Sequence, residues 1–201
     1  MLLRARRSPL RLADQLRSAL REASPRVLAG DDSAVPGDDA IPAAVLVAVT
    51  DREQPGVILT VRRDNLRTHA GQIAFPGGRI DPGEDPAAAA IREAWEELSL
   101  DPDRVEPVAA LDAYCTITGY LITPLLAVVP PDLPLTPHDH EVADWFEAPL
   151  AFLLDPANQR HESVLFEGRE RHYYRIDWEG RKIWGATAAM LVNLSRRLRW
   201  S

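Results

Sequence analysis

The sequence contains a single cysteine, Cys115, among its 201 residues. One thiol cannot form a disulfide within the chain, so the composition gives no support for an oxidising compartment. We expect a structural role for Cys115, because a reactive thiol needs an activating partner and no histidine lies near it in the sequence. These observations favour a cytoplasmic protein.

Long apolar runs are also missing. No stretch of about 18 consecutive apolar residues occurs, so we expect no membrane-spanning helix and no membrane partner. Several arginines near the N-terminus weakly suggest a transit peptide. Ser8 and Pro9, however, are typical of the cap and first turn of a helix, so we favour an ordinary helix at this point.

Positive charge is scarce. The chain has 23 Lys and Arg against 30 Asp and Glu, which gives a formal net charge of −7. Nucleic-acid binding depends on clustered lysine and arginine, so we expect no nucleic-acid partner. A small phosphorylated substrate is still compatible with this charge, because bound metal ions can supply positive charge locally.

The order of the predicted elements indicates a mixed α+β fold. Helices and strands do not alternate regularly, so a βαβ winding is not favoured. The length fits one domain, residues 41–201, with a helix and loop in residues 1–40 that are either part of it or appended to it. Helices are predicted over residues 8–22, 87–98, 149–154 and 186–198. Strands are predicted over residues 43–50, 56–62, 72–75, 105–111, 120–129, 141–146, 171–178 and 181–184, with long loops over 29–41 and 130–140.

The helix over residues 87–98 carries three carboxylates on one face. With about 100° per residue, Glu93, Glu96 and Glu97 fall within an arc of roughly 100°. Each like-charge pair at i,i+3 or i,i+4 is unfavourable by about 0.2–0.5 kcal/mol in an isolated helix, and on this helix only Arg92 offers compensation. The apolar face is predicted on the opposite side of the helix, at Ile91, Ala94, Trp95 and Leu98.

Two interpretations of this acidic face are open. It is either a solvated surface or a site for a hard cation such as Mg²⁺ or Mn²⁺, which binds carboxylate oxygen. Residues 78–100 contain six acidic and two basic side chains, and such a segment packs more easily with cations present. Gly77 and Gly78, just upstream, suit a sharp turn and the close approach of a ligand. We therefore favour the cation site.

Residues 78–100 resemble the Nudix box, which is Gly, five residues, Glu, seven residues, and then Arg-Glu-apolar-any-Glu-Glu-any-Gly-apolar. Eight of its nine defined positions match. The departure is Ser99, where the box has the glycine that suits a left-handed residue closing a helix. Serine adopts that conformation at a cost of about 1–2 kcal/mol, so we expect a local loss of stability. The matching residues are Gly78, Glu84, Arg92, Glu93, Ala94, Glu96, Glu97 and Leu100.

A narrower resemblance links the chain to the coenzyme A pyrophosphatases. It lies directly upstream of the box, in residues 58–63 and 66–78, and continues in residues 116–120 and 183–188. Guanidinium groups pair well with phosphate, and coenzyme A carries a diphosphate and a 3′-phosphate. Structural ion pairs are an equal alternative for these arginines, and the histidine is either an orienting group or a turn residue. The basic cluster comprises Arg62, Arg63, Arg67 and His69.

The resemblance to the box implies a Nudix-type mixed β-sheet sandwiched between helices (α/β/α), and a role for each matching residue. Glu93, Glu96 and Glu97 would ligate one or more Mg²⁺ or Mn²⁺ ions. Arg92 would orient a carboxylate, and Glu84 would brace the loop or touch a metal through water. The general base is left open between Glu97 and Glu141, and Glu141 is equally well an exposed acid at a strand edge. Gly77 and Gly78 are candidates for substrate binding.

The implied reaction is metal-dependent hydrolysis of a diphosphate bond. In coenzyme A it gives 3′,5′-ADP and 4′-phosphopantetheine. The alternatives are hydrolysis of another nucleoside diphosphate derivative, such as NADH or ADP-ribose, and a catalytically weak ligand-binding module. We expect a small-molecule partner and a monomer or homodimer.

Overall fold

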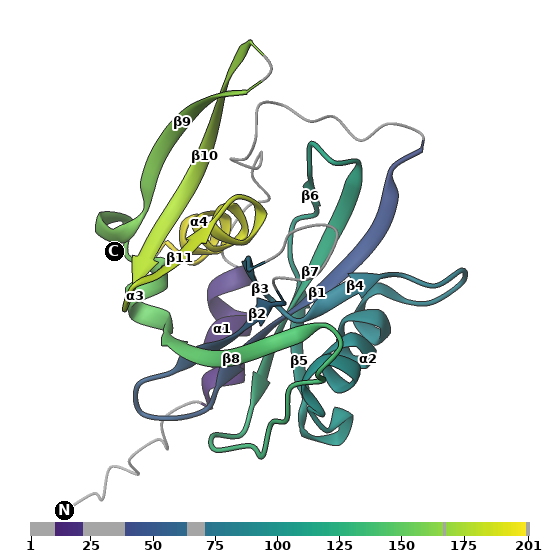
Figure 1. The fold of residues 1–201 in the computed structure, drawn as a ribbon. Helices are drawn as coiled ribbons and strands as arrows, with labels where there is room; N and C mark the ends of the chain where they lie inside the picture. The colour runs from purple at the N-terminus through teal and green to yellow at the C-terminus, as the bar shows by residue number, and fades with distance from the viewer. Residues whose placement is uncertain (1–10, 22–38, 64–70, 167, 200–201) are drawn as a thin grey trace, which may run out of the picture.

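The structure, a computed structural model, describes residues 11–21, 39–63, 71–166 and 168–199 (Figure 1). Its centre is a mixed sheet in which β1 (Ile41–Thr50) and β7 (Tyr120–Val129) run parallel. The strand order is β3-β2-β1-β7-β5, and the other pairings are antiparallel. The remaining strands of this sheet are β2 (Gly56–Arg62), β3 (Ile73–Ala74), β4 (Gly77–Arg79), β5 (Glu106–Ala110), β6 (Tyr114–Cys115) and β8 (Val142–Pro149).

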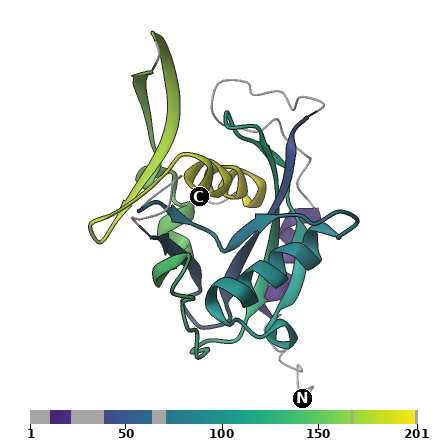
Figure 2. The same ribbon diagram turned by 45° about the vertical axis from the view of Figure 1, so that its right-hand side comes forward.

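Helices cover both faces of this sheet. Helix α2 (Pro86–Leu98) packs on one face, where its alanines and Leu98 join a buried apolar cluster. Helices α1 (Leu12–Arg21) and α4 (Ala186–Leu198) belong to the second and larger cluster, which contains Leu16 and Leu191. Figure 2 shows α2 and α1 on opposite sides of the sheet. The predicted α+β fold, a mixed sheet sandwiched between helices, is confirmed.

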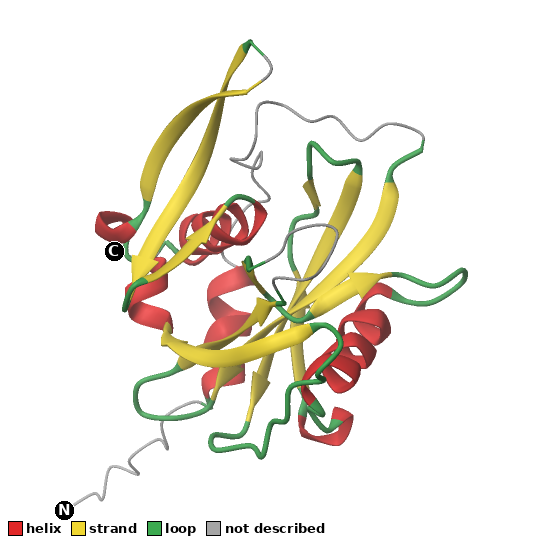
Figure 3. Cartoon of the chain, in the orientation of Figure 1, coloured by secondary structure: helices red, strands yellow, loops and turns green. Residues whose placement is uncertain are grey.

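A second, antiparallel sheet has the order β11-β10-β9. Its strands are β9 (Arg160–Phe166), β10 (Arg169–Trp178) and β11 (Arg181–Trp184). Helix α3 (Leu150–Leu154) leads from the first sheet towards it, and α4 packs against β10 and β11. In Figure 3 the far ends of β9 and β10 project beyond the rest of the chain. Two short 3₁₀ turns, Pro102–Arg104 and Pro156–Asn158, complete the described elements.

The sequence predicted most of these elements but missed three strands, β4, β6 and β9. β4 was read as a turn, because Gly77 and Gly78 lack side chains that favour a strand; its pairing with β1 rests on the backbone. β9 was missed because its first four residues, Arg160 to Ser163, are polar and show no apolar alternation. The predicted strand over 141–146 begins one residue later and extends to Pro149.

The helical wheel placed Trp95 on the wrong face. Its side chain is 52% exposed, whereas Glu97, assigned to the acidic face, is only 4% exposed. Helix α2 packs on the sheet along a line through Ala90, Ala94 and Leu98. The buried stripe is therefore rotated towards the acidic arc, which turns Trp95 outwards and carries Glu97 inwards.

The ends of α2 follow the predicted chemistry. The Asp85 side chain accepts hydrogen bonds from the N–H groups of Ala87 and Ala88, and Pro86 occupies the first turn. At the other end Ser99 has φ 55° and ψ 31°, the left-handed conformation expected at the position of the box glycine, and its N–H donates to Trp95 O. A serine thus occupies a conformation that glycine adopts without strain.

Helix α1 begins at Leu12, later than the predicted start, because Arg11 is not helical; residues 8–10 and 22 of the prediction lie outside the described residues. Its apolar residues Ala13, Leu16 and Leu20 are buried in the same cluster as α4 and the central sheet. Arg17 donates to Glu106 and to the carbonyl of Pro107, which ties the helix to β5. Within the described ranges, no helix is long and apolar enough to span a bilayer.

Replacing Ser99 by glycine is expected to raise stability by about 0.5–1 kcal/mol. The change relieves a left-handed serine but increases the freedom of the unfolded chain, so the two effects partly cancel. Chemical denaturation measures the result. Ser163→Gly, the same change within β9 where φ is not positive, serves as the matched control and is expected to destabilise. Equal destabilisation by both changes would contradict this account of the α2 terminus.

Candidate active site

A pocket of about 450 Å³ lies between the C-terminal half of α2 and the turn that precedes β8. The turn is fixed to the helix end by its backbone, because the N–H of His138 donates to Glu97 O and that of Thr136 to Leu98 O. These bonds satisfy carbonyl groups that a helix terminus otherwise leaves without partners. The pocket is lined by Glu93, Trp95, Glu96, Glu97, Ser99, His138 and Glu141.

Glu97 is the most buried carboxylate of this pocket. Its Oε2 accepts a hydrogen bond of 3.2 Å from the N–H of Gly77 in β4. Burial raises the pKa of Glu97 to about 8; the Gly77 hydrogen bond and the charge of Arg62 oppose this rise, while Glu93 and Glu141 add to it. The protein thus holds a carboxyl group where ionisation is unfavourable without additional positive charge.

Glu93 lies beside the same glycine pair. A Cβ atom at Gly78 would come within 2.5 Å of the Glu93 carboxylate, so only glycine allows this approach. Burial raises the pKa of Glu93, and the hydrogen bond from Arg92 opposes that rise. Gly77 and Gly78, predicted to bind substrate, therefore have a defined structural task here, which is to let β4 pass close to two carboxylates of α2.

Arg92 connects the loop to three glutamates. Its Nε and Nη2 donate to the two carboxylate oxygens of Glu84 at 2.9 and 3.0 Å, and Nη1 donates to Glu93 at 2.9 Å and Glu96 at 3.2 Å. A bidentate guanidinium–carboxylate pair is among the stronger ion pairs in proteins. Arg92 lowers the pKa of Glu84 and is itself shifted upwards in pKa, first by Glu84. This arrangement agrees with the orienting role expected of Arg92.

Glu84 has both oxygens engaged. One of them also accepts a hydrogen bond from the N–H of Asp81, which closes the turn before α2. Of the two roles left open for Glu84, the contacts support bracing of the loop. Glu96 is about half exposed, at 55% of its side chain, and its described polar contact is with Arg92.

Glu141 occupies the turn just before β8 rather than the strand itself. It is exposed, yet it lines the pocket and is close enough to Glu93 and Glu97 to raise the pKa of both. Its position therefore suits a general base better than a purely peripheral acid, although Glu97 fits that role as well.

The carboxylates fit a hard cation in their chemistry but do not form a ready-made cage. Among the described residues, no group of three His, Cys, Asp or Glu side chains is placed to hold a metal ion. Arg92 draws Glu93 and Glu96 towards itself, whereas Glu97 is held by Gly77. The donors are all carboxylate oxygens, the type that Mg²⁺ and Mn²⁺ prefer. A cation bound here would have to share Glu93 and Glu96 with Arg92.

Arg62 and Arg63, at the end of β2, form the described part of the predicted basic cluster. Arg62 acts electrostatically on Glu97, so its charge lies near the pocket floor. The buried Nε atoms of both arginines have no hydrogen-bond acceptor in the described part of the chain. Arg63 lies 3.8 Å from the exposed Asp139, a weak ion pair. Arg67 and His69 fall outside the described residues.

Sequence reasoning missed two residues of the pocket wall, His138 and Trp95. His138 lies in a loop read only as proline-rich, and Trp95 was assigned to the core. A signal for His138 was present in the spacing, because it precedes the candidate Glu141 by one turn. No comparable signal marked Trp95.

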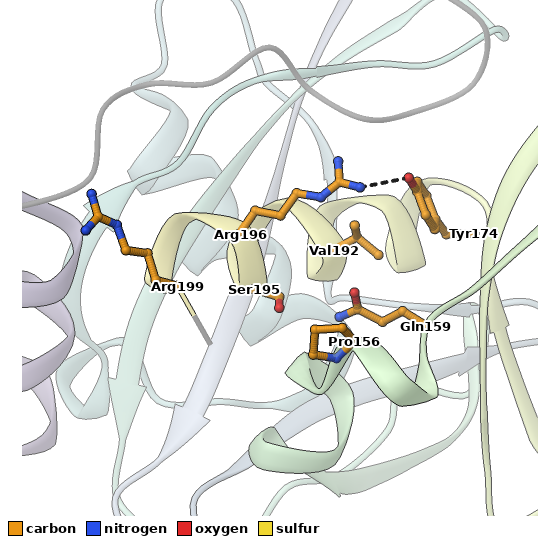
Figure 4. A pocket seen from close by; sticks show the side chains of 7 residues that line it. All are labelled: Pro156, Gln159, Tyr174, Val192, Ser195, Arg196 and Arg199. Carbon is orange, nitrogen blue, oxygen red and sulfur yellow. Dashed lines mark hydrogen bonds between the residues drawn. The ribbon is translucent and has the colours of Figure 1, made fainter. Parts of the chain in front are cut away.

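A second pocket, of about 430 Å³, differs from the first in its charge (Figure 4). It lies along α4 beside β10 and has no carboxylate in its lining. Arg196 is held by the hydroxyl of Tyr174 at 3.0 Å, and Ser195 donates to Leu154 O. In Figure 4 the side chain of Arg199 points away from Tyr174. Its described lining lacks the donors for a hard cation, and the first pocket, which holds Glu93, Glu96 and Glu97, is the candidate active site.

Several known proteins are similar to this chain. A model of the NUDIX domain matches residues 40–167. The uncharacterized Nudix hydrolase NudL of Escherichia coli K12 is 40% identical over 158 residues, which cover 78% of this chain and 82% of NudL. NudL of Shigella boydii serotype 4 is 39% identical over the same shares of both chains. Among solved structures, the Nudix hydrolase RenU of M. smegmatis covers 62% of this chain and 80% of its own, with 21% identity and a TM-score of 0.49.

The family model spans more than half of the chain and contains the whole pocket. The relatives match across most of both sequences. The chain therefore belongs to the Nudix hydrolases.

Proposed function

We propose that this Nudix hydrolase cleaves the diphosphate bond of coenzyme A or a derivative, with Mg²⁺ or Mn²⁺, to give 3′,5′-ADP and 4′-phosphopantetheine. The observation that carries the chemistry is the placement of two carboxylates, the buried Glu97 and the partly buried Glu93, beside the side-chain-free backbone of β4. Buried carboxylates with raised pKa values are typical of functional sites, because stability alone would not favour them.

The choice of substrate rests on how the segments that resemble coenzyme A pyrophosphatases are joined. In the structure they meet at the box although they are far apart in the sequence. The Thr187 hydroxyl donates to Ile73 O at 3.1 Å, which links residues 183–188 to the segment upstream of the box. Arg79 donates to the hydroxyl of Tyr120 at 3.2 Å, which links residues 116–120 to the box. The described parts of the segments in the narrower resemblance are therefore linked to one another or to the box.

Arg62 is the described cation best placed for a diphosphate. It lies at the end of β2 close enough to Glu97 to lower its pKa, and its buried Nε lacks an acceptor in the part of the chain that the structure covers. A phosphate oxygen would satisfy that donor. Guanidinium groups suit this task because they bind phosphate oxygens with fixed geometry.

The carboxylates of the pocket, with Arg92 and Glu84 behind them, divide the proposed reaction between them. Glu93, Glu96 and Glu97 would hold the cations, which when bound neutralise charge on the diphosphate and activate the attacking water. Arg92 keeps Glu93 and Glu96 oriented, and Glu84 keeps Arg92 in place. The proton of the attacking water passes to Glu97 or Glu141, the two carboxylates left open as general base.

Glu97→Gln is expected to lower Mg²⁺-dependent turnover by about two or more orders of magnitude. The amide oxygen of glutamine can still accept the hydrogen bond from Gly77, so the fold is kept while the charge is lost. Steady-state kinetics measure the effect. Glu53→Gln, in the exposed turn between β1 and β2, is the matched control and should leave turnover unchanged. Wild-type turnover in the Glu97 variant would refute a role for this residue.

The same substitution should change how metal-free stability depends on pH. Because the pKa of Glu97 is raised to about 8 in the folded protein, ionisation destabilises the fold as pH rises above the unfolded-state value of about 4.5. Glu97→Gln should therefore be more stable than wild type at pH 9 and equal to it at pH 4. Thermal unfolding with a chelator present measures this difference. If the two proteins show the same pH profile, Glu97 is not held as a buried carboxyl group.

A substrate panel tests the proposed function itself. The protein is incubated with Mn²⁺ and coenzyme A, NADH, ADP-ribose or a nucleoside triphosphate, and products are identified by mass. Coenzyme A should be preferred, with 3′,5′-ADP as product. Arg67→Gln should reduce activity on coenzyme A more than on dephospho-coenzyme A, because the latter lacks the 3′-phosphate. Preference for another member of the panel would favour the alternative, a Nudix hydrolase of a different nucleoside diphosphate derivative.

A further inference from the structure

Trp95 is the most exposed tryptophan of the four that the structure describes. Its side chain is 52% exposed on the wall of the carboxylate pocket. The other three are engaged with neighbours. Trp178 stacks on Phe146 with ring centres 5.5 Å apart, Trp184 contacts Tyr173 and Lys182, and Trp145 packs on the α2 core cluster. Among the described tryptophans, Trp95 therefore leaves the most indole surface exposed, at the wall of the carboxylate pocket.

The packing of α2 does not require this tryptophan. The helix is held on the sheet by small residues and one leucine, namely Ala89, Ala90, Ala94 and Leu98. Trp95 points away from that line, so a polar residue would serve the helix equally well there. The exposed indole instead borders a pocket whose other walls are carboxylates, Ser99 and His138.

The opposite wall also carries rings. His138 lines the pocket, and its ring centre lies 5.4 Å from that of His140. The bond from the His138 N–H to Glu97 O fixes this loop over the end of α2. The pocket is therefore lined by an indole from the helix and an imidazole from the loop, next to the carboxylates.

We propose that Trp95 is a specificity-determining residue that stacks on the heteroaromatic base of the nucleotide substrate. This inference rests on the proposed function, which supplies a substrate with a base attached to a diphosphate. In coenzyme A that base is adenine. Aromatic side chains stack on the π face of any base. Trp95 therefore favours substrates that carry a base but does not distinguish one base from another.

The stacking has a kinetic signature. Trp95 does not contact the bond that breaks, so its loss weakens binding more than chemistry. From the usual contribution of one stacked base, Trp95→Ala should raise KM for coenzyme A by about 5- to 100-fold with kcat nearly unchanged. Trp95→Phe, which keeps a smaller ring, should restore part of this loss. Leu165→Ala, at an exposed residue of β9, is the control and should match wild type.

A binding experiment tests the proposal without turnover. Fluorescence titration with adenosine 3′,5′-bisphosphate and Mg²⁺ should quench wild type, and Trp95→Phe should lose that quenching. Ribose 5-phosphate, which has no base, should bind wild type and Trp95→Ala equally. Unchanged KM in Trp95→Ala, or equal loss of both probes, would overturn the stacking role. If wild type cleaves another base-containing diphosphate instead of coenzyme A, the proposed function fails, and the same variants then test stacking with that substrate.

Discussion

The placement of the Glu97 carboxylate against the Gly77 amide is the constraint around which this molecule is organised. The bond joins the buried side of α2 to β4, and β4 in turn pairs with the central strand β1. Any side chain at Gly77 would collide with the backbone of β1, and any at Gly78 with Glu93. The two adjacent glycines thereby allow α2 and β4 to lie so close together that carboxylates of α2 reach the backbone of β4.

Arg92 completes this arrangement from the solvent side. It holds Glu84, Glu93 and Glu96 with one guanidinium and also donates to Arg79 O. The loop before α2, the helix and the end of β4 are thus one connected unit. A single arginine cannot neutralise all of these carboxylates, and Glu97 lies beyond its reach. The negative charge that remains is what a dication would balance, and it explains why a stable fold retains an unfavourably buried carboxyl group.

The sequence predicted the ends of α2 better than the direction in which this helix packs. Local rules account for Asp85, Pro86 and the left-handed Ser99, because caps depend on neighbouring residues alone. The spacing of the carboxylates predicted that Glu93, Glu96 and Glu97 share one region, and all three line the same pocket. The direction in which α2 packs depends on the sheet, however, and a helical wheel is drawn from the helix sequence alone. For that reason Glu97 was expected on an acidic face rather than in the core, and Trp95 in the core rather than at the pocket.

Sequence analysis also failed to predict strands that have few apolar side chains. β4 and β9 are formed by pairing with β1 and β10, and neither shows a regular alternation of its own. The pairing partner decides such strands, as does the close approach of backbone that glycine permits.

The most direct test of the central claim is a crystal of the protein soaked in Mn²⁺ and examined by anomalous diffraction. A manganese peak in contact with Glu93 and Glu97 is expected; manganese bound elsewhere, with both carboxylates free of metal, would contradict the account.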